Sequence, residues 1–559
     1  MAWGGGKFLV QNKVLPGYYF KLLSASKDAI VMSDRGKAAV GLALDWGVDE
    51  KVVTISKGQF QKDAAKYFGY DYASAKLAPV REVFKYATHL IYYRLNGGGT
   101  KASCKWATAK CSGIRGNDLT IVIAGALDEP GKYDVFTYLR DEQGNNIRKD
   151  KQRVASLDEI KDNDFVEFKR SSATGICGVY KLDILTPLGS GDTLKIGDKS
   201  YAYSSAATTA EAQAEAIAKL YASDSTFDAV AVGGTVIFTQ KTAGTGEIPA
   251  VDATGVTAGS VKVATVTDGM AAGTAIELTE DAGTALTGGA NGVVTGAAHQ
   301  DFLAQLERVH YHCLACNSTD AATISLYIEY QKRLSHECGK VAQCVVYGYS
   351  INGTAKTEVK PDSYDIIVVE NAVITAGVPE HYGIFWVLGA AAGCAVNKTV
   401  QNRIYNGEYE FYVNYTQDEL AQKLGNGKYM FHETINIENE VEVRVLDDVN
   451  SFVTVTEEEN SNYKKNQLIR VLYQIITDVG GTFNEKWQGI TPNDADGRAA
   501  FKGVIVKYLL TLQGIRAIQG VDESRILVEQ GETKGAVYMA IPVNNVVAMF
   551  QCYNEITVE

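Results

Sequence analysis

Residue types that bind zinc crowd into one short stretch of the sequence. The stretch contains His310, His312, Cys313 and Cys316, and His336 and Cys338 follow downstream. Thiolates and imidazoles are the usual ligands of structural zinc, but no second Cys-x-x-Cys pair completes a zinc ribbon. The sequence VHYHCLAC favours a buried strand, in which alternation places His310 and His312 on one side and Cys313 on the other. A strand core is therefore the preferred interpretation, and a metal site is the alternative.

Other motifs that could carry chemistry lack the required spacing or context. The glycine-rich run 96–101 has its lysine after its threonine, so the order of a phosphate-binding loop is missing. No G-x-S-x-G or H-E-x-x-H motif occurs. The carboxylate pair Asp447 and Asp448 borders an expected exposed loop, which favours a solvated acidic face. The sequence therefore predicts no catalytic residue, no cofactor and no metal, and favours a protein that is not an enzyme.

Composition sets limits on the protein class. The chain has 559 residues, 46% hydrophobic residues and a formal net charge of -12, so we expect several folded domains. The acidic balance argues against a nucleic-acid partner. No signal peptide pattern opens the sequence, and the longest apolar run, residues 383–396, is too short to span a bilayer. We therefore expect a protein that stays in a cytoplasm with its nine cysteines reduced and without direct membrane insertion.

The first third of the chain divides into three expected regions. Residues 1–28 predict an extended arm, because apolar, β-prone sequence surrounds a Pro16-Gly17 kink. Residues 29–104 alternate strand and helix patterns, which favours an α/β domain. Residues 105–187 contain several short strands separated by turn clusters, which is typical of a β-sandwich.

The remaining chain predicts three further regions. Residues 188–270 shift to Ala, Thr, Gly and Ser and predict a small α+β module inserted into a host domain. Residues 271–436 return to alternating strands and helices, which suggests a largely parallel sheet flanked by helices. Residues 437–559 predict a strand, two amphipathic helices and a β-rich end. The expected fold class is thus a multidomain combination of α+β and α/β units with extended terminal strands.

Several collinear motifs resemble the sheath protein of contractile tails, which tailed phages and phage-tail-like bacteriocins share. The opening Asn12-Lys13-Val14-Leu15-Pro16-Gly17 resembles the family's N-terminal arm, and Ala43-Leu44-Asp45-Trp46-Gly47 resembles its next strand and turn. Further similar stretches lie at residues 93–102, 107–119, 286–292, 483–489 and 508–519. Cys111-Ser112 departs from the aromatic residue and proline that the family more often has. The resemblance covers nearly the whole chain outside the insert.

The resemblance implies a structural subunit of a helical, contractile sheath. In the family, terminal arms add strands to the C-terminal domains of neighbouring copies, and that domain faces the tail tube. Implied partners are further copies of the chain, a tail tube protein, and baseplate and tail terminator proteins, with assembly in a bacterial cytoplasm. Candidate arm residues between subunits are Phe8, Val10, Val14, Tyr18, Val537, Met539, Ile541, Ile556 and Val558.

Candidates for a tube-facing surface are Arg498, Lys502 and Lys507, with an ordinary solvated helix face as an equal alternative. Two other function classes stay open. One is a non-contractile tube or shell. The other is a protease-like hydrolase, which would need a Ser-His-Asp constellation that no motif supplies.

Overall fold

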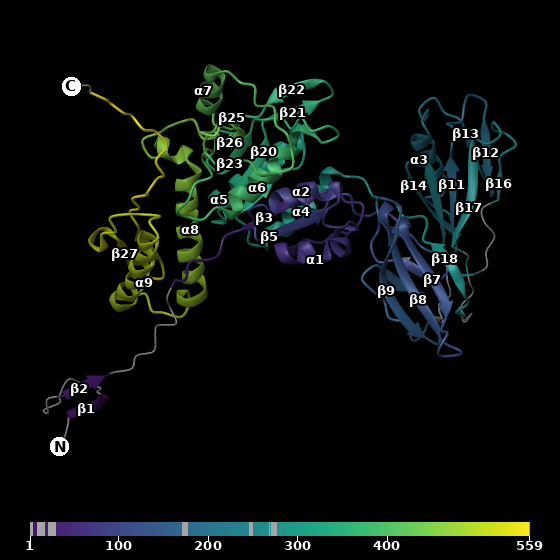
Figure 1. Cartoon of the computed structure of the whole chain (residues 1–559), viewed down its shortest axis with the longest axis horizontal. Coiled ribbons are helices and arrows are strands. Elements are labelled where there is room, and N and C mark those ends of the chain that lie inside the picture. The colour runs from purple at the N-terminus through teal and green to yellow at the C-terminus, as the bar shows by residue number, and fades with distance from the viewer. Residues whose placement is uncertain are drawn as a thin grey trace.

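The computed structural model describes residues 4–7, 17–20, 30–169, 177–244, 250–267, 269 and 277–557. These residues form an elongated row of units, with the C-terminal helices at one end and the inserted module at the other (Figure 1). No helix within the described ranges is long and apolar enough to cross a membrane.

A seven-stranded sheet forms the centre of the molecule, and two distant parts of the chain build it. Its order is β24-β23-β20-β19-β3-β5-β4, and all neighbours are parallel except the antiparallel β4–β5 pair. The strands are β3 (Lys37–Leu42), β4 (Val53–Ser56), β5 (His89–Arg94), β19 (Cys313–Ala315), β20 (Gln343–Tyr347), β23 (Ile366–Val369) and β24 (Lys428–Tyr429). The sequence suggested separate domains at 29–104 and 271–436, but their strands share this sheet. Alternation of elements identifies strands but not their neighbours across a parallel sheet.

Helices cover both faces of the central sheet. One face packs against α1 (Lys57–Phe68), α2 (Ala78–Val83) and α6 (Gly383–Gly393), and the other against α4 (Gly296–Leu306) and α5 (Ala321–His336). Helix α6 is apolar on all sides, so it lies buried in the core. Helix α7 (Gln417–Gly425) precedes β24 and begins with a capping box between Thr416 and Glu419.

A β-sandwich follows the first part of the central unit, as the sequence predicted. Its larger sheet has the antiparallel order β18-β7-β8-β9, and a short antiparallel pair, β6–β10, forms the second layer of the shared core. The strands are β6 (Ala107–Ala109), β7 (Leu119–Gly125), β8 (Tyr133–Arg140), β9 (Asn146–Val154), β10 (Val166–Phe168) and β18 (Asp281–Ala285). Strand β18 returns to this sheet from beyond the insert.

The inserted module has its own core and two sheets, ordered β14-β15-β11-β17 and β13-β12-β16, with helix α3 packed against them. Its elements are β11 (Val179–Ile184), β12 (Thr193–Ile196), β13 (Lys199–Ala202), α3 (Ala210–Leu220), β14 (Phe227–Val232), β15 (Thr235–Gln240), β16 (Val251–Asp252) and β17 (Val261–Thr267). The sequence placed the first strand in the sandwich, but β11 is a central strand of the module. The insert therefore begins before residue 188.

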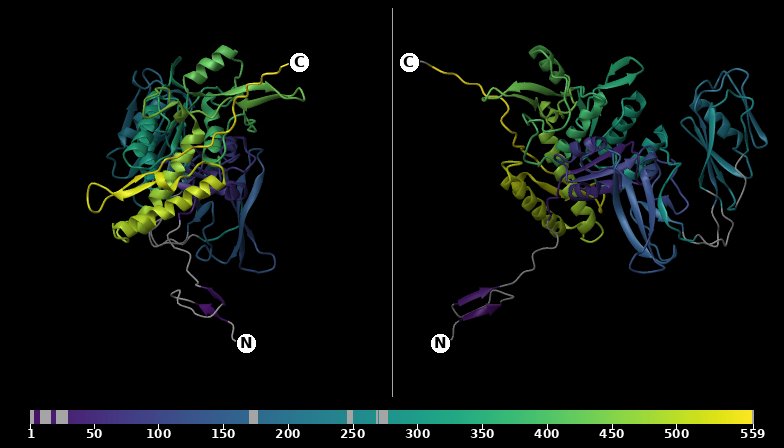
Figure 2. Two further views of the ribbon diagram at one scale, coloured as in Figure 1. Left: turned by 90° about the vertical axis from the view of Figure 1, so that its left-hand side faces the viewer. Right: turned by 45° about the vertical axis from the view of Figure 1, so that its right-hand side comes forward.

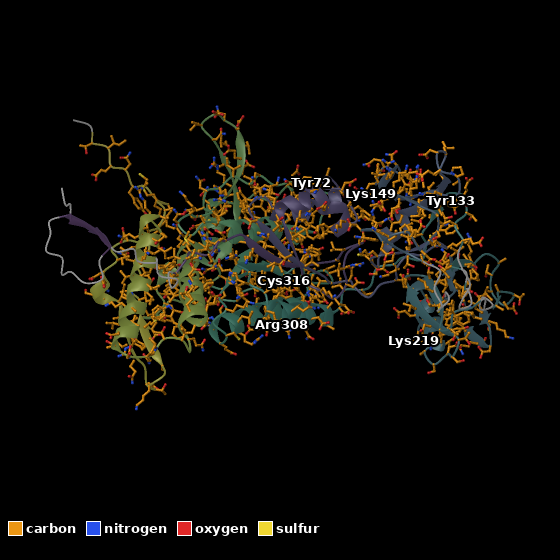
Figure 3. The ribbon with its side chains drawn as sticks, turned by 90° about the horizontal axis from the view of Figure 1, so that it is seen from below. Tyr72, Tyr133, Lys149, Lys219, Arg308 and Cys316 are labelled. Atoms are coloured by element: carbon orange, nitrogen blue, oxygen red, sulfur yellow. The ribbon has the colours of Figure 1, made fainter. Side chains whose placement is uncertain are left out.

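Polar contacts join the central unit to the sandwich. The buried Arg94 Nη1 donates to the Ser112 carbonyl oxygen at 2.9 Å and to Asp49 Oδ1 at 2.9 Å. Asn291 Nδ2 donates to Asp45 Oδ1 at 2.8 Å. Lys149 Nζ on β9 lies 3.4 Å from Asp71 Oδ1 of the central unit, whereas Lys219 of α3 lies in the module at the far end (Figure 3). Residues from separated sequence motifs thus meet at one junction.

The C-terminal unit is helical with one small sheet. Its elements are α8 (Asn466–Thr482), the π-helical turn Phe483–Trp487, α9 (Ala495–Gly514), β27 (Leu527–Gln530) and β28 (Val537–Ala540). Val471, Ile475 and Val479, spaced by four residues on α8, enter the core against α9. Residues 441–445, which the sequence assigned to this unit, instead form β26 (Val441–Val445) and pair with β25 (Phe431–Ile435) of the central unit.

Two hairpins and one strand pair complete the fold. The hairpins are β25–β26 and β21 (Tyr349–Asn352) with β22 (Ala355–Glu358). Near the N-terminus, β1 (Gly4–Lys7) pairs in parallel with β2 (Gly17–Phe20), away from the body of the molecule (Figures 1 and 2).

Candidate assembly surface

The small sheet of the C-terminal unit has free edges. Strands β27 and β28 pair from Leu527 with Ala540 to Gln530 with Val537, and neither outer edge has a strand partner among the described residues. One face packs against the α9 core through Val528 and Met539, whereas Tyr538 on the other face is exposed. An isolated two-stranded sheet is marginally stable, so this hairpin is suited to accept further strands.

Three expected arm residues lie in or beside this hairpin. Val537 and Met539 belong to β28 and pair with residues of the same chain, and Ile541 follows directly and packs against the same core. These residues therefore form part of a sheet that could receive a strand, not a strand that leaves the subunit. Period-2 sequence signals a strand, but it does not separate an intrachain hairpin from a donated arm.

After this hairpin, the chain is hydrogen-bonded to the C-terminal unit as far as Ala548 and leaves its surface beyond that residue. Gln519 N donates to the Asn544 carbonyl oxygen at 2.8 Å, and Ala548 N donates to Gln467 Oε1 at 3.1 Å. Beyond Ala548 the chain is extended, and its apolar side chains are largely exposed. These side chains are Met549, Phe550, Tyr553 and Ile556. A run of exposed apolar groups on an extended segment points to a surface elsewhere that covers it.

Most of the N-terminal arm lies outside the described residues. Phe8, Val10 and Val14 fall there, as does Val558 at the other end, and Tyr18 is placed only as a backbone position in β2.

The root of the N-terminal arm is fixed to the C-terminal unit. Ser33 Oγ donates to Asp478 Oδ1 on α8 at 2.6 Å, and Arg35 Nε donates to the Cys394 carbonyl oxygen after α6 at 3.0 Å. Burial, together with the charge of Arg470, lowers the pKa of the Arg35 guanidinium to about 10. The arm thus leaves the body from between α6 and α8.

The three candidate tube-facing cations do not share one face of α9. Arg498 Nη1 donates to the Asn493 carbonyl oxygen at 2.9 Å and to Asn493 Oδ1 at 3.1 Å. The guanidinium of Arg498 therefore binds the segment that precedes the helix. Lys502 is half-buried and Lys507 is exposed. At about 100° per residue, Lys507 lies on the side of the helix opposite Arg498. A single flat partner cannot contact both residues through this helix.

The histidine and cysteine cluster lies in and beside the central sheet. Strand β19 begins at Cys313, so His310 and His312 precede it, and their rings meet edge to face at a centroid distance of 4.8 Å. Burial lowers the pKa of His312 to about 2, and its Nδ1 accepts from Lys37 N at 3.2 Å. Cys313 and Cys316 enter the cores on opposite faces of the sheet. No three metal-binding side chains converge within the described ranges.

Family models match three parts of the chain. The N-terminal region of domain III of the tail sheath protein Gp18 matches residues 35–95, the phage tail sheath protein central domain matches residues 292–451, and the phage tail sheath C-terminal domain matches residues 458–559. The chain belongs to the phage tail sheath protein family. The resemblance inferred from the sequence motifs is thereby confirmed.

Relatives extend the match to the full length. The phage-like element PBSX protein XkdK of Bacillus subtilis (strain 168) is 25% identical over 574 residues, which cover 99% of each chain. The sheath tail protein of Desulfitobacterium hafniense superposes with a TM-score of 0.62 at 25% identity, over 95% of this chain and 96% of that one. The sheath tail protein of Listeria innocua gives a TM-score of 0.63 at 22% identity over 93% and 94%. The expected multidomain sheath fold is thus confirmed.

Proposed function

We propose that this sheath protein polymerises helically around a tail tube and contracts to drive the tube through a target cell envelope. Membership of the sheath family supports this role, as does similarity to a protein of a phage-like element. Further copies, a tail tube protein, and baseplate and tail terminator proteins are the proposed partners. Assembly takes place in a bacterial cytoplasm, and the product is a virion tail or a released tail-like particle.

The observation that carries this proposal is a hairpin with free edges in the same unit from which an extended chain end leaves. Strands from neighbouring copies would extend β27–β28 through main-chain hydrogen bonds, as in β-augmentation. The hydrogen bonds of the added strand would join two copies, while the extended segment beyond Ala548 would allow their bodies to rotate and slide relative to one another. Copies would therefore stay connected while the sheath shortens.

In this scheme, the free energy for contraction comes from the repacking of contact surfaces between copies as the sheath changes from one packed state to another. In the proposed mechanism, contraction requires neither a nucleotide nor a catalytic group. A hydrolase role is the less favoured alternative, and covalent labelling of the purified protein by a serine-reactive probe would support it.

Deletion of residues 1–20 tests the arm mechanism. The truncated chain should fold, since its cores lie elsewhere, yet remain a soluble monomer in sedimentation and negative-stain microscopy. Ordered tubes formed by the truncated protein would refute strand exchange by this arm.

The lengths of the tubes that the unmodified protein forms test contraction. A single tube length under all conditions would support the alternative of a static tube or shell, whereas two discrete tube lengths would support contraction.

A further inference from the structure

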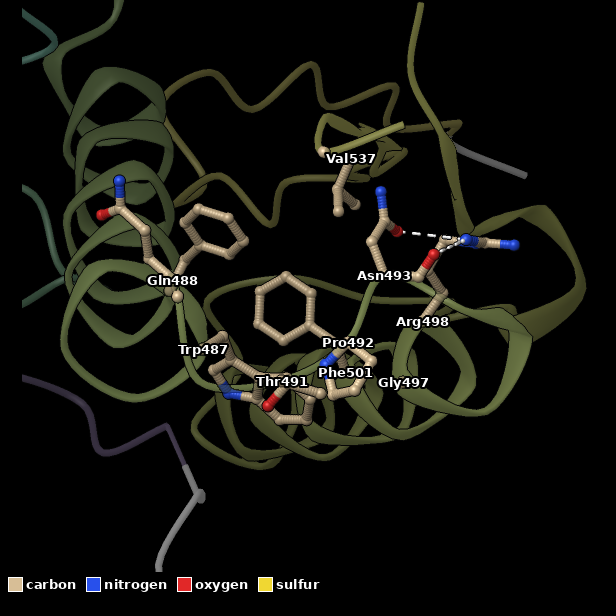
Figure 4. Close-up of a pocket in the computed structure, with 12 residues that line it drawn as sticks. Trp487, Gln488, Thr491, Pro492, Asn493, Gly497, Arg498, Phe501 and Val537 are labelled. Carbon is tan, nitrogen blue, oxygen red and sulfur yellow. Dashed lines mark hydrogen bonds between the residues drawn. The ribbon is translucent and has the colours of Figure 1, made fainter. Parts of the chain in front are cut away.

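A small aromatic pocket opens beside the free hairpin of the C-terminal unit. It has a volume of about 100 Å³ and lies between the turn after α8, the start of α9 and the start of β28. Figure 4 shows the Val537 side chain pointing toward the Phe501 ring, with Trp487 beneath and with Asn493 and Arg498 on one side. The Trp487 and Phe501 rings lie 4.8 Å apart. The pocket is sized for one aliphatic side chain.

This pocket continues the inner face of the β27–β28 sheet. Val537 lines it and is the first residue of β28, and Met539 lies two residues further on the same face, toward α9. A strand added along the free edge of β28 would direct every second side chain toward α9. One of those side chains would lie over the pocket.

The end of the same chain is directed away from this pocket. From its anchor at Ala548 the tail runs away from the β27–β28 hairpin in each view that shows both (Figures 1 and 2). Eight residues separate Ala548 from Ile556, so an extended tail reaches at most about 29 Å from its anchor. The tail is therefore placed to contact another copy, not its own hairpin.

The alternation of side chains along the tail indicates which tail residue could enter the pocket. In an extended conformation, one face carries Phe550, Cys552, Asn554, Ile556 and Val558, and the other carries Met549, Gln551, Tyr553, Glu555 and Thr557. The first face is the more apolar and suits the α9 side of the sheet. Phe550 is already held near its own body, with Lys465 Nζ 4.5 Å from its ring centroid, whereas Ile556 is 79% exposed. Residues 549–557 include Glu555 but no Lys or Arg, so their charge complements Arg498 at the pocket.

We propose that Ile556, on the strand that the tail of a second copy would add to β28 in the assembly proposed above, inserts into the pocket formed by Trp487, Phe501 and Val537. This inference rests on the proposed sheath assembly and assigns one anchoring contact within it. Burial of the isoleucine fixes the register of the added strand, because main-chain hydrogen bonds alone permit slippage by two residues.

Cysteine crosslinking between two differently labelled chains tests this contact. One chain carries Ile556→Cys and the other carries Gly535→Cys, and both carry Ser at the exposed or half-buried positions 177, 338 and 552. A side chain at Gly535, which lines the pocket, meets no atom within 4 Å. Mixed assembled tubes should give a heterodimer band under mild oxidation, since a disulfide requires Cα atoms within about 7 Å. Thr557→Cys on the opposite face, and Gly503→Cys on exposed α9 where a side chain is equally unobstructed, are matched controls.

The outcomes separate this inference from the proposed function. A heterodimer at least tenfold stronger than with either control supports insertion of Ile556. Tubes without that band, or with equal bands for the controls, overturn the pocket assignment and leave the sheath function standing. Failure of the unmodified protein to form tubes at all would overturn both. As a second measurement, Ile556→Ala should raise the concentration needed for assembly about tenfold, and Thr557→Ala should leave it unchanged.

Discussion

Glu82 is a buried acid whose charge opposes folding of the central unit. Its Oε2 accepts from Tyr405 Oη at 2.9 Å and its Oε1 from Glu408 N at 2.6 Å. Burial nevertheless raises the pKa of Glu82 to about 7, and those hydrogen bonds offset it only in part. Because the folded pKa exceeds the unfolded one, the associated stability is full below about pH 4.5 and is lost as the pH rises through 7.

Glu82→Gln should therefore stabilise the protein at high pH. At pH 8 the gain in unfolding free energy should be on the order of 3 kcal/mol, and at pH 4.5 it should nearly vanish. Calorimetric melting of the central unit at the two pH values measures the difference. Glu410→Gln, at an exposed position nearby, is the matched control, and an equal response of both variants would contradict the assignment.

Residue types alone do not predict where buried polar and ionisable side chains lie or which residues they contact. The sequence places the zinc-like cluster in a strand core, and Cys313 does lie in β19, but both histidines precede the strand. Sequence patterns do not indicate the junction of Arg94, Asp45 and Asn291, because its members are up to 246 residues apart. Local patterns report burial and alternation, whereas these contacts depend on how distant loops meet.

At the element scale, the β27–β28 hairpin should be weakly protected in an isolated subunit. It has two strands, exposed outer edges and one face against α9, so opening requires little loss of buried surface. In hydrogen exchange measured by mass spectrometry, peptides covering residues 527–541 should exchange rapidly in monomers and at least tenfold more slowly in tubes.

Helix α8 supplies the internal control for that exchange experiment. Val471, Ile475 and Val479 hold it against the core, so residues 466–482 should be protected in both states. Unchanged exchange of the hairpin on assembly would contradict strand addition. The sequence predicted two amphipathic helices in residues 437–559, and α8 and α9 lie there, because amphipathic periodicity is a local signal. It could not show that Val537 and Met539 pair with β27 of their own chain, since the partner of a strand is not encoded in its own alternation.

For the whole molecule, the chain leaves the central sheet after β5 and returns at β19, and the sandwich and inserted module lie between. The family models match residues 35–95, 292–451 and 458–559, which are the central and C-terminal units. The proposed assembly surface belongs to the C-terminal unit, and the module lies at the opposite end of the molecule (Figure 1). The chain should therefore assemble into tubes without the inserted module.

Removal of residues 177–267 tests this separation. The first residue of β11, Val179, pairs with the last residue of β17, Thr267, so the module begins and ends at one place and has a core of its own. Its loss should leave the sandwich intact, because β18 and β10 reach that domain from outside the deleted range. The shortened chain should form tubes of unchanged inner diameter and smaller outer diameter in electron micrographs. A matched deletion of residues 527–541, which removes the hairpin, should abolish tubes while leaving a folded monomer. If loss of the module also abolished tubes, it would have to contribute contacts between copies, and assembly could not be confined to the C-terminal unit.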